Sequence, residues 1–384
     1  MELTKCKLGE LITQRREKND GSDLPICGVS KDGLIPPKQK DADTSIYNVF
    51  YRDDFIFNPA RMELNSIAIN DMYDRAICSS LYEVFYVHRT DLLLPHYLEL
   101  IIRQKWFTRY CKFLGQGSAR EYCRFGNISE IEIEFPPIEE QQKIVEYNTA
   151  IENRIALKQK INDNLVAVGT ASIQKNVGRG ALINLTEAEM DSLIFPEDFK
   201  IKTVSEFCAE TKSGSTPSRT NNEYWENGTI SWVKSGEVHN NITLQTEEYI
   251  TSLGLSESST KLLPKDTVLM AMYGVTAGEV GYLAIEATTN QAICGMICRS
   301  KAEAAYLYFS LIQSQAAISR LSNGGAQDNL SKNFIDNIKI VVPPSEFIEK
   351  LNLAAIVEQM TLNTKEIILL EELQATVLAQ LSSR

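Results

Sequence analysis

Residues 131–144 read Ile-Glu-Ile-Glu-Phe-Pro-Pro-Ile-Glu-Glu-Gln-Gln-Lys-Ile, and this stretch decides the fold. Its first five residues alternate apolar and polar side chains, which predicts a strand with one buried face. The Pro136–Pro137 pair cannot donate to a strand ladder and ends that strand. Acidic residues then open an apolar-periodic segment, where they complement the dipole of a helix. We therefore predict a strand that leads directly into a helix.

The same arrangement recurs later in the chain, where Ile338–Val342 precedes Pro343–Pro344. Other segments recur in the same order. The number of residues that separates the two members of each match varies slightly along the chain, as insertions in loops would cause. The matched segments are Leu8–Ile12 with Val204–Cys208, Ala76–Cys78 with Ala292–Cys294, Tyr97–Leu98 with Tyr306–Leu307, Gly117–Ala119 with Gly324–Ala326, and Ile128, Ile131 and Ile133 with Ile335, Ile338 and Ile340. Each match is weak alone, but their shared order predicts an internal duplication. The fold class is therefore α+β, with two β-rich domains.

Each copy continues into a long helix whose apolar residues recur at alternating steps of three and four. The residues of this seam are Ile151, Ile155, Leu165, Leu353, Ile356, Met360, Asn363, Ile367, Leu370, Val377 and Leu381, of which only Asn363 is polar. Lys158, Asn162 and Gln374 also interrupt it. Such stripes commonly face a core, but polar residues in corresponding places favour pairing of the two helices with each other. We expect two long, coiled-coil-like helices that pair with each other, the first spanning about 50 Å over roughly 34 residues.

The composition is that of a multi-domain globular protein. The chain has 384 residues, 39 Lys+Arg and 50 Asp+Glu, for a formal net charge of −11. No apolar run approaches ~18 residues, and no signal peptide is recognisable at the N-terminus. The eight cysteines form no CxxC pair and the three histidines lie far apart, so we expect no metal site and free thiols in a reducing cytoplasm.

Charge is distributed unevenly within the first copy. Residues 101–124 contain six basic residues and one acidic residue, interleaved with five aromatic residues, and a sixth aromatic residue, Phe125, follows. Such a cluster can pair with phosphates and contact bases, although an amphipathic helix with solvated charges explains residues 101–113 equally well. The Gly/Ser/Gln/Arg segment at 115–120 has little packing value and offers hydrogen-bond donors. The candidate contact residues of this copy are Gln116, Ser118, Arg120, Tyr122 and Arg124, with Arg61 and Arg75 less firmly indicated.

The second copy offers amide and hydroxyl groups with less charge, in the segments 213–219, 230–236, 273–276 and 324–332. Trp225 and Trp232 are expected in the core. Arginine, glutamine and asparagine make bidentate contacts to bases, each worth about 1–3 kcal/mol of discrimination. The candidate contact residues of this copy are Arg219, Lys234, Ser235, Tyr273, Thr276, Gln327, Asn329 and Lys332.

Catalytic motifs are missing from the sequence. It contains no GxxxxGK[ST] phosphate loop, and the tetrapeptides Phe135–Ile138 and Val342–Ser345 lack the end residues of an amino-methyltransferase motif. No histidine stands in a recognisable triad, and no nuclease carboxylate cluster is evident. We therefore predict no catalytic residue in this chain.

The chain resembles the specificity subunit of Type I restriction–modification systems. The resemblance rests on segments in the same order along nearly the whole chain. They are Lys7–Glu10, Phe57–Arg61, Gly117–Ser118 and Phe135–Ile144 in the first copy, and Thr216–Ser218, Glu223–Trp225, Ile230–Gly236, Leu263–Gly274, Gly278–Gly281, Thr289–Ala292, Gly325–Ser331 and Val342–Pro344 in the second.

The resemblance implies a non-catalytic subunit that reads a bipartite DNA target, one β-rich target recognition domain per half-site. It also implies that the two long helices pack antiparallel as a spacer and that the two halves are related by a pseudo-twofold axis. Its partners would be double-stranded DNA, two modification subunits that bind S-adenosylmethionine and methylate adenine N6, and restriction subunits that use ATP and Mg²⁺. The expected domains are 1–137 (target recognition domain 1), 138–180 (spacer helix 1 and linker), 181–344 (target recognition domain 2) and 345–384 (spacer helix 2). The chain would be cytoplasmic, in a bacterium or archaeon, and without a cofactor of its own.

Two alternatives stay open from the sequence. One is a protein–protein scaffold without direct DNA readout. The other is the specificity subunit of a solitary methyltransferase or a related anti-phage system. If the chain reads DNA, its net charge predicts weak binding when isolated, because neutralisation of phosphates supplies much of the non-specific affinity. Modification subunits would then supply the missing cationic surface.

Overall fold

The structure is a computed structural model that describes residues 3–31, 33–37, 43–115, 122–183, 185–239, 241–322 and 329–382. The chain divides into two compact units. Unit 1 comprises residues 1–154 and 370–384, and unit 2 comprises residues 155–369. In the part of the chain that the structure describes, no helix combines the length and apolarity needed to cross a bilayer.

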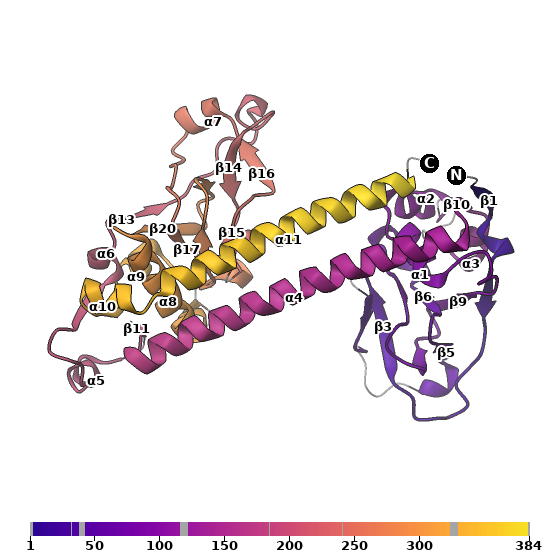
Figure 1. Ribbon diagram of the computed structural model, residues 1–384, viewed down its shortest axis with the longest axis horizontal. Helices are drawn as coiled ribbons and strands as arrows, with labels where there is room; N and C mark the ends of the chain where they lie inside the picture. The colour runs from indigo at the N-terminus through magenta and orange to yellow at the C-terminus, as the bar shows by residue number, and fades with distance from the viewer. Residues whose placement is uncertain are drawn as a thin grey trace. The chain divides into compact units, whose positions relative to one another are not determined.

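Unit 1 holds two four-stranded sheets and a two-stranded ladder, drawn in indigo and purple in Figure 1. The strand orders are β2-β9-β6-β7, β4-β3-β8-β5 and β1-β10. The strands are β1 Thr4–Lys7, β2 Ile12–Arg15, β3 Ile26–Ser30, β4 Gly33–Ile35, β5 Asn48–Tyr51, β6 Phe55–Phe57, β7 Ile67–Ile69, β8 Arg75–Cys78, β9 Glu83–Val87 and β10 Glu132–Phe135. The helices are η1 Leu8–Glu10, η2 Thr44–Ile46, η3 Pro59–Leu64, α1 Pro95–Ile102, α2 Lys105–Gly115 and α3 Phe125–Ser129.

Unit 2 holds one five-stranded and two three-stranded sheets, in the orders β13-β20-β17-β18-β15, β16-β14-β19 and β11-β21-β12. The strands are β11 Ala181–Leu182, β12 Lys200–Thr203, β13 Glu210–Ser213, β14 Ile230–Val233, β15 Ile242–Thr243, β16 Glu248–Ile250, β17 Thr267–Ala271, β18 Val280–Leu283, β19 Thr288–Thr289, β20 Ile293–Ile297 and β21 Lys339–Val342. The helices are α5 Glu187–Asp191, α6 Val204–Phe207, η4 Asn222–Tyr224, η5 Ser235–Glu237, α7 Ser252–Ser256, η6 Gly274–Thr276, α8 Lys301–Ser322, α9 Lys332–Asp336 and α10 Ser345–Lys350.

The two units share one strand plan, which confirms the predicted duplication. In unit 1, β2 pairs with β9, β9 with β6 and β6 with β7, and all three ladders are antiparallel. In unit 2, β13, β20, β17 and β18 pair in the same order and sense. The ladders before the Pro-Pro pairs also agree, since Thr4 lies opposite Phe135 and Lys200 opposite Val342. The Leu8–Ile12 and Pro-Pro matches therefore join equivalent positions.

One proposed match is wrong. Ala76–Cys78 belongs to β8, which pairs with β3 and β5, whereas Ala292–Cys294 leads into β20. The unit 1 equivalent of β20 is β9. Strand β9 pairs with β2, which follows η1, and β20 pairs with β13, which follows α6, and these two short helices lie in the matched Leu8–Ile12 and Val204–Cys208 segments. An Ala-Ile-Cys triplet suits any fully buried strand, so its recurrence carries no information on register.

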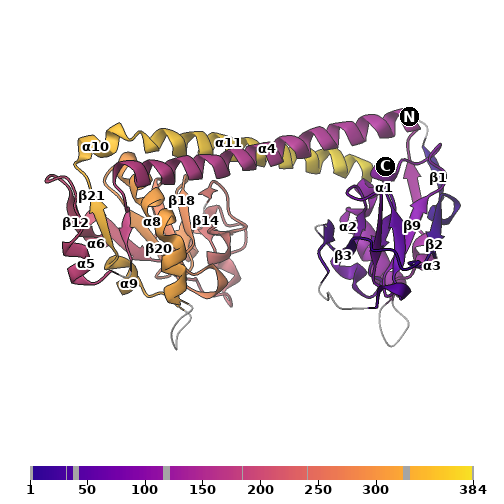
Figure 2. The same ribbon diagram turned by 90° about the horizontal axis from the view of Figure 1, so that it is seen from below.

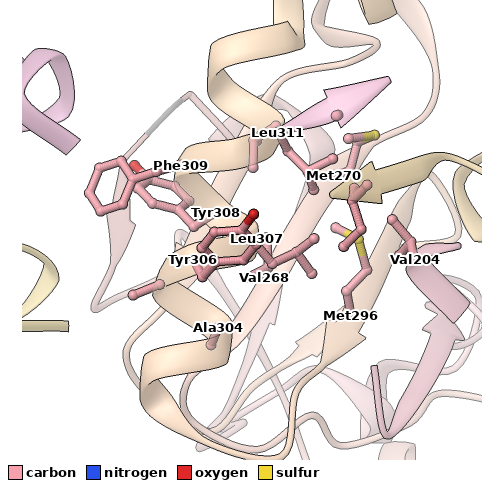
Figure 3. Close-up of a cluster of buried hydrophobic side chains, with 14 of the residues drawn as sticks. Val204, Val268, Met270, Met296, Ala304, Tyr306, Leu307, Tyr308, Phe309 and Leu311 are labelled. Atoms are coloured by element: carbon pink, nitrogen blue, oxygen red, sulfur yellow. The ribbon is translucent and has the colours of Figure 1, made fainter. Parts of the chain in front are cut away.

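The core of unit 2 forms where α8 covers the five-stranded sheet, as Figures 2 and 3 show. Tyr306, Leu307 and Phe309 are fully buried, and Tyr306 donates a hydrogen bond to the carbonyl of Val341. Helix α4 (Ile138–Asn176) reaches this core through Gly169, where an added Cβ would lie 2.3 Å from the ring of Phe309. Glycine is therefore required there for the close approach of α4 to α8.

Figure 1 shows α4 in magenta and α11 (Leu353–Ser382) in yellow as unbroken helices of 39 and 30 residues. Of the predicted seam residues whose side chains are described, none is exposed. Those residues are Ile151, Ile155, Leu165, Leu353, Ile356, Met360, Asn363, Ile367, Leu370 and Val377. Leu381 lies on α11, but its side chain is outside the described part.

The polar residues of the seam bond to each other within each unit. In unit 2, Asn363 donates to Asn162 Oδ1 at 2.9 Å and accepts from Lys158 Nζ at 3.1 Å. In unit 1, Gln374 donates to Asn148 Oδ1 at 3.0 Å. In unit 2, Asn162 bonds Thr364 while Lys158 pairs with Glu366, so the two helices run antiparallel there. The interruptions read in the sequence are therefore satisfied polar contacts.

Replacing Asn363 by alanine is expected to lower the free energy of unfolding by about 1–3 kcal/mol, because Lys158 and Asn162 would lose a buried partner. Asn363 is 1% exposed. The measurement is urea denaturation of the full chain, with Leu362→Ala as the matched control, since Leu362 is 57% exposed on the same turn. Equal effects of the two substitutions would contradict a stabilising role for the polar network.

Candidate DNA-reading surfaces

Two of the predicted unit 1 residues, Arg61 and Tyr122, line one open hollow of about 1140 Å³. Arg61 is exposed on η3, where its φ of −138° and ψ of 26° kink the helix. Lys31, Tyr47 and Tyr82 line the same hollow and were not predicted. The hollow thus joins two cations and one acidic residue, Glu63, to three tyrosines, which suits a surface that contacts phosphates and base faces.

The other two predicted contact arginines of unit 1 that the structure describes, Arg75 and Arg124, are paired with carboxylates. Arg75 Nη2 lies 3.4 Å from Glu17 and 3.5 Å from Asp20. Arg124 Nη1 lies 3.7 Å from Glu83, and its guanidinium carbon lies 5.5 Å from the ring centroid of Tyr122. The Arg124 side chain is 68% exposed, so a weak surface pair leaves it free to approach a ligand.

Helix α2 has a mixed character that the sequence left open. Phe107 and Cys111 are buried in the unit 1 core, as an amphipathic helix requires. Tyr110 and Phe113 are 40% and 64% exposed, and their rings stack with centroids 6.2 Å apart. The exposed face of α2 therefore adds an aromatic pair beside exposed Lys112.

In unit 2 the predicted residues Arg219 and Lys234 meet at one cluster, which we call the Arg219 cluster and define as Arg219, Lys234, Glu247, Glu248, Trp225 and Trp232. Arg219 Nη1 donates to Glu248. Lys234 Nζ lies 2.5 Å from Glu247 and 3.3 Å from Glu248. Two basic and two acidic side chains thus cancel in net charge.

The indole rings complete the cluster. The guanidinium carbon of Arg219 lies 3.6 Å from the ring centroid of Trp225 and 4.9 Å from that of Trp232. Trp232 is buried as predicted, but Trp225 is only half-buried and contacts Arg219. Cation–π contacts of this kind hold a guanidinium over a ring.

Strand register places these groups together. Trp232 on β14 lies directly opposite Glu248 on β16, so both side chains stand on one face of the sheet. The Glu237 carboxylate fixes the neighbouring backbone, accepting from Lys234 N at 2.7 Å and Glu247 N at 2.9 Å. Ser235, also predicted, follows at the start of η5.

Contacts within the cluster favour the charged forms of Glu248 and Lys234. The hydrogen bond from Arg219 lowers the pKa of the Glu248 carboxyl, and Lys234 lowers it further against the opposing effect of partial burial. Hydrogen bonds to Glu247 and then Glu248 raise the pKa of Lys234. Both pKa shifts therefore favour the ionised form of the Lys234–Glu248 pair.

The remaining predicted residues of unit 2 differ in whether their side chains are available to contact DNA. Tyr273 is 41% exposed and pairs with Asn329 in an isolated antiparallel bridge outside the named strands. Thr276 is buried and its hydroxyl faces the carbonyl of Tyr273 at 3.4 Å. Lys332 Nζ donates to Asp336 at 2.5 Å and Thr211 at 2.7 Å. Thr276 and Lys332 thus have structural contacts within the unit.

Four predicted residues lie outside the described part: Gln116, Ser118, Arg120 and Gln327. Among the residues that the structure does describe, no group of three or more His, Cys, Asp or Glu side chains could hold a metal ion. Two further residues that the sequence did not indicate, Glu247 and Glu248, lie in a segment with no motif. The β14–β16 register reveals Glu248, and the contact with Lys234 reveals Glu247.

Comparison with known proteins supports the resemblance. The family model for the Type I restriction modification DNA specificity domain matches residues 9–167 and 196–372, one copy in each half. The Type I restriction enzyme HindI specificity subunit of Haemophilus influenzae is 22% identical over 67% of this chain and 70% of its own length. The MjaIX specificity subunit of Methanocaldococcus jannaschii is 20% identical over 76% and 69%.

A solved structure agrees in fold. The S subunit of a Type I restriction–modification system from M. genitalium has a TM-score of 0.58 at 15% identity, and the match covers 99% of this chain and 96% of that one. The α+β class is thereby confirmed. With the family model matching both halves, the chain belongs to the family of Type I restriction–modification DNA specificity subunits, which are non-catalytic.

Proposed function

We propose that this chain reads a bipartite DNA target, with one half-site contacted by each unit. The observation that carries the proposal is that the units share a strand plan while presenting different surface chemistry. Unit 1 offers the hollow beside Arg61 and Tyr122, and unit 2 offers the Arg219 cluster. One scaffold with two sets of side chains suits two different base sequences, since fold and site specificity are separable.

In this proposal the chain recognises the DNA sequence and its partner subunits carry out the catalytic reactions. Two modification subunits would bind S-adenosylmethionine and methylate adenine N6, and restriction subunits would cleave DNA with ATP and Mg²⁺. Residues 1–137 and 181–344 would be the two target recognition domains, and 138–180 and 345–384 the spacer segments that dock the partners, in the cytoplasm. Half-sites roughly one helical turn, ~34–36 Å, apart suit such a pair of readers.

The test is adenine methylome sequencing of cells that carry this chain with a modification subunit encoded beside it. The expected result is N6-methyladenine in one two-part motif with a fixed gap, and none when either protein is omitted. Replacing 181–344 with the corresponding region of a relative should change one half of the motif only. Methylation by this chain alone, or a motif that survives the replacement unchanged, would overturn the proposal.

A further inference from the structure

The Arg219 cluster is a neutral group of charges at a place where the proposed function requires a cationic reader. Glu248 touches both cations, through Arg219 Nη1 and through Lys234 Nζ at 3.3 Å. Glu247 touches Lys234 alone at 2.5 Å and is 70% exposed. The two neighbouring carboxylates therefore hold different numbers of cations, although they carry the same charge.

Arg219 keeps hydrogen-bonding capacity despite its pairing. Within the described ranges its Nε and Nη2 have no hydrogen-bond partner, and the side chain is 49% exposed. Contact with Trp225 and Trp232 fixes the guanidinium on the sheet face. A planar guanidinium fixed in this way presents donors in a defined direction, which a flexible cation does not.

We propose that Glu248 is a positioning residue that determines the selectivity of unit 2. It occupies Arg219 Nη1 and Lys234 so that neither cation is freely available to a DNA phosphate, while the open donors of Arg219 remain directed at a base edge. The proposal rests on the proposed function and adds a residue that opposes sequence-independent binding.

The physical reason is a difference between two ligands of Arg219. A phosphate contact gains mainly from charge neutralisation and counterion release, and an arginine already neutralised by a carboxylate contributes little of either. A guanine edge presents O6 and N7 as neutral acceptors and needs correctly directed donors rather than net charge. Glu248 therefore weakens binding to any duplex more than it weakens binding to the target.

Three substitutions separate this role from a general effect of charge. Glu248→Gln removes the charge that touches both cations, and Glu247→Gln removes the same charge one residue away. Glu248→Asp keeps the charge but shortens the side chain, which draws the carboxylate away from Arg219. Each variant is assembled with the modification subunits, and melting temperatures establish that the assemblies are folded.

The measurement is the affinity of each assembly for a target duplex and for an equally long duplex without the motif, across a range of salt concentrations. For Glu248→Gln we expect non-target affinity to rise about tenfold and the salt dependence to steepen by ~1–2 in log–log slope, as one or two released cations require. The target to non-target ratio should fall about tenfold. Glu248→Asp should follow in the same direction, and Glu247→Gln should change the ratio by less than about twofold.

Equal effects of Glu247→Gln and Glu248→Gln, or an unchanged ratio in Glu248→Gln, would overturn the proposal, because either result would reduce Glu248 to one more surface charge. These results are distinguishable from failure of the proposed function. If the unsubstituted assembly shows no preference for any motif, the proposed function fails; if it is selective and Glu248→Gln is equally selective, only this inference fails.

Discussion

Adding four residues to both long helices is expected to abolish methylation of the native target and to transfer it to targets with a longer gap. The insertion sites are between Arg154 and Ile155 in α4 and between Leu369 and Leu370 in α11, where the chain divides into its two units. Four helical residues add about 6 Å, which corresponds to at most ~2 base pairs of duplex at 3.4 Å each.

The insertions leave the polar contacts of each unit in place. The Lys158–Asn363 contact belongs to unit 2 and the Asn148–Gln374 contact belongs to unit 1, and neither is interrupted. On the native target, one half-site would then be lost while the other is bound. The assembly would lose at least about 3 kcal/mol of binding free energy from base contacts, which lowers its affinity for the native target roughly 100-fold.

The measurement is again the methylome, which reports the gap directly. Insertion into one helix only is the control, because it shifts one seam against the other and should abolish methylation at every gap. An unchanged gap in the double insertion would refute the view that helix length sets the distance between the half-sites.

The repeated plan could be predicted because its signals are local. A period of two before a Pro-Pro pair and acidic residues after it define strand, break and helix within a few residues. The predicted strands at 131–135 and 338–342 accordingly appear as β10 and β21, and the helix after the first begins at Ile138. Polar interruptions of a 3–4 pattern likewise identify positions that need a partner on a facing helix.

Register and long-range contacts could not be predicted from the same signals. The Ala-Ile-Cys match joined β8 to β20, because buried strands of similar composition are interchangeable in sequence but not in ladder order. Thr276 and Lys332 have the chemistry of contact residues, yet each bonds within the unit. Side-chain type indicates what a residue can bind, and only the fold decides whether a neighbour already occupies it.

The Arg219 cluster contains both residues that the sequence could indicate and residues that it could not. Arg219 and Lys234 could be selected from the sequence because their residue types bind DNA. Glu248 and the contact of Trp225 with Arg219 could not. Glu248 is 29 residues from Arg219 in the sequence, and the pairing of β14 with β16 brings it opposite Trp232, whose ring Arg219 also contacts. Five of the six described basic candidates, all but Arg61, are likewise paired with carboxylates that the sequence alone did not indicate.

Replacing Arg219 by lysine is expected to lower methylation of the native target about 10- to 100-fold, equivalent to about 1–3 kcal/mol of lost base discrimination. Lysine keeps the charge but loses the planar fork that contacts Trp225 and presents two donors. The loss should be confined to one half of the motif, so that targets altered in that half become acceptable while the other half stays fixed. Methylation rates on duplexes with single base changes in each half-site measure this directly.

Two controls make the result specific. Arg124→Lys in unit 1 should relax the opposite half of the motif, because Arg124 is exposed beside Tyr122 and belongs to the other reader. Lys332→Ala should lower the melting temperature without relaxing either half, because its ammonium group is bonded to Asp336 and Thr211 within unit 2. If Arg219→Lys weakened both halves equally, or if Lys332→Ala relaxed one half while leaving stability unchanged, the division between reading and structural cations drawn from these contacts would be wrong.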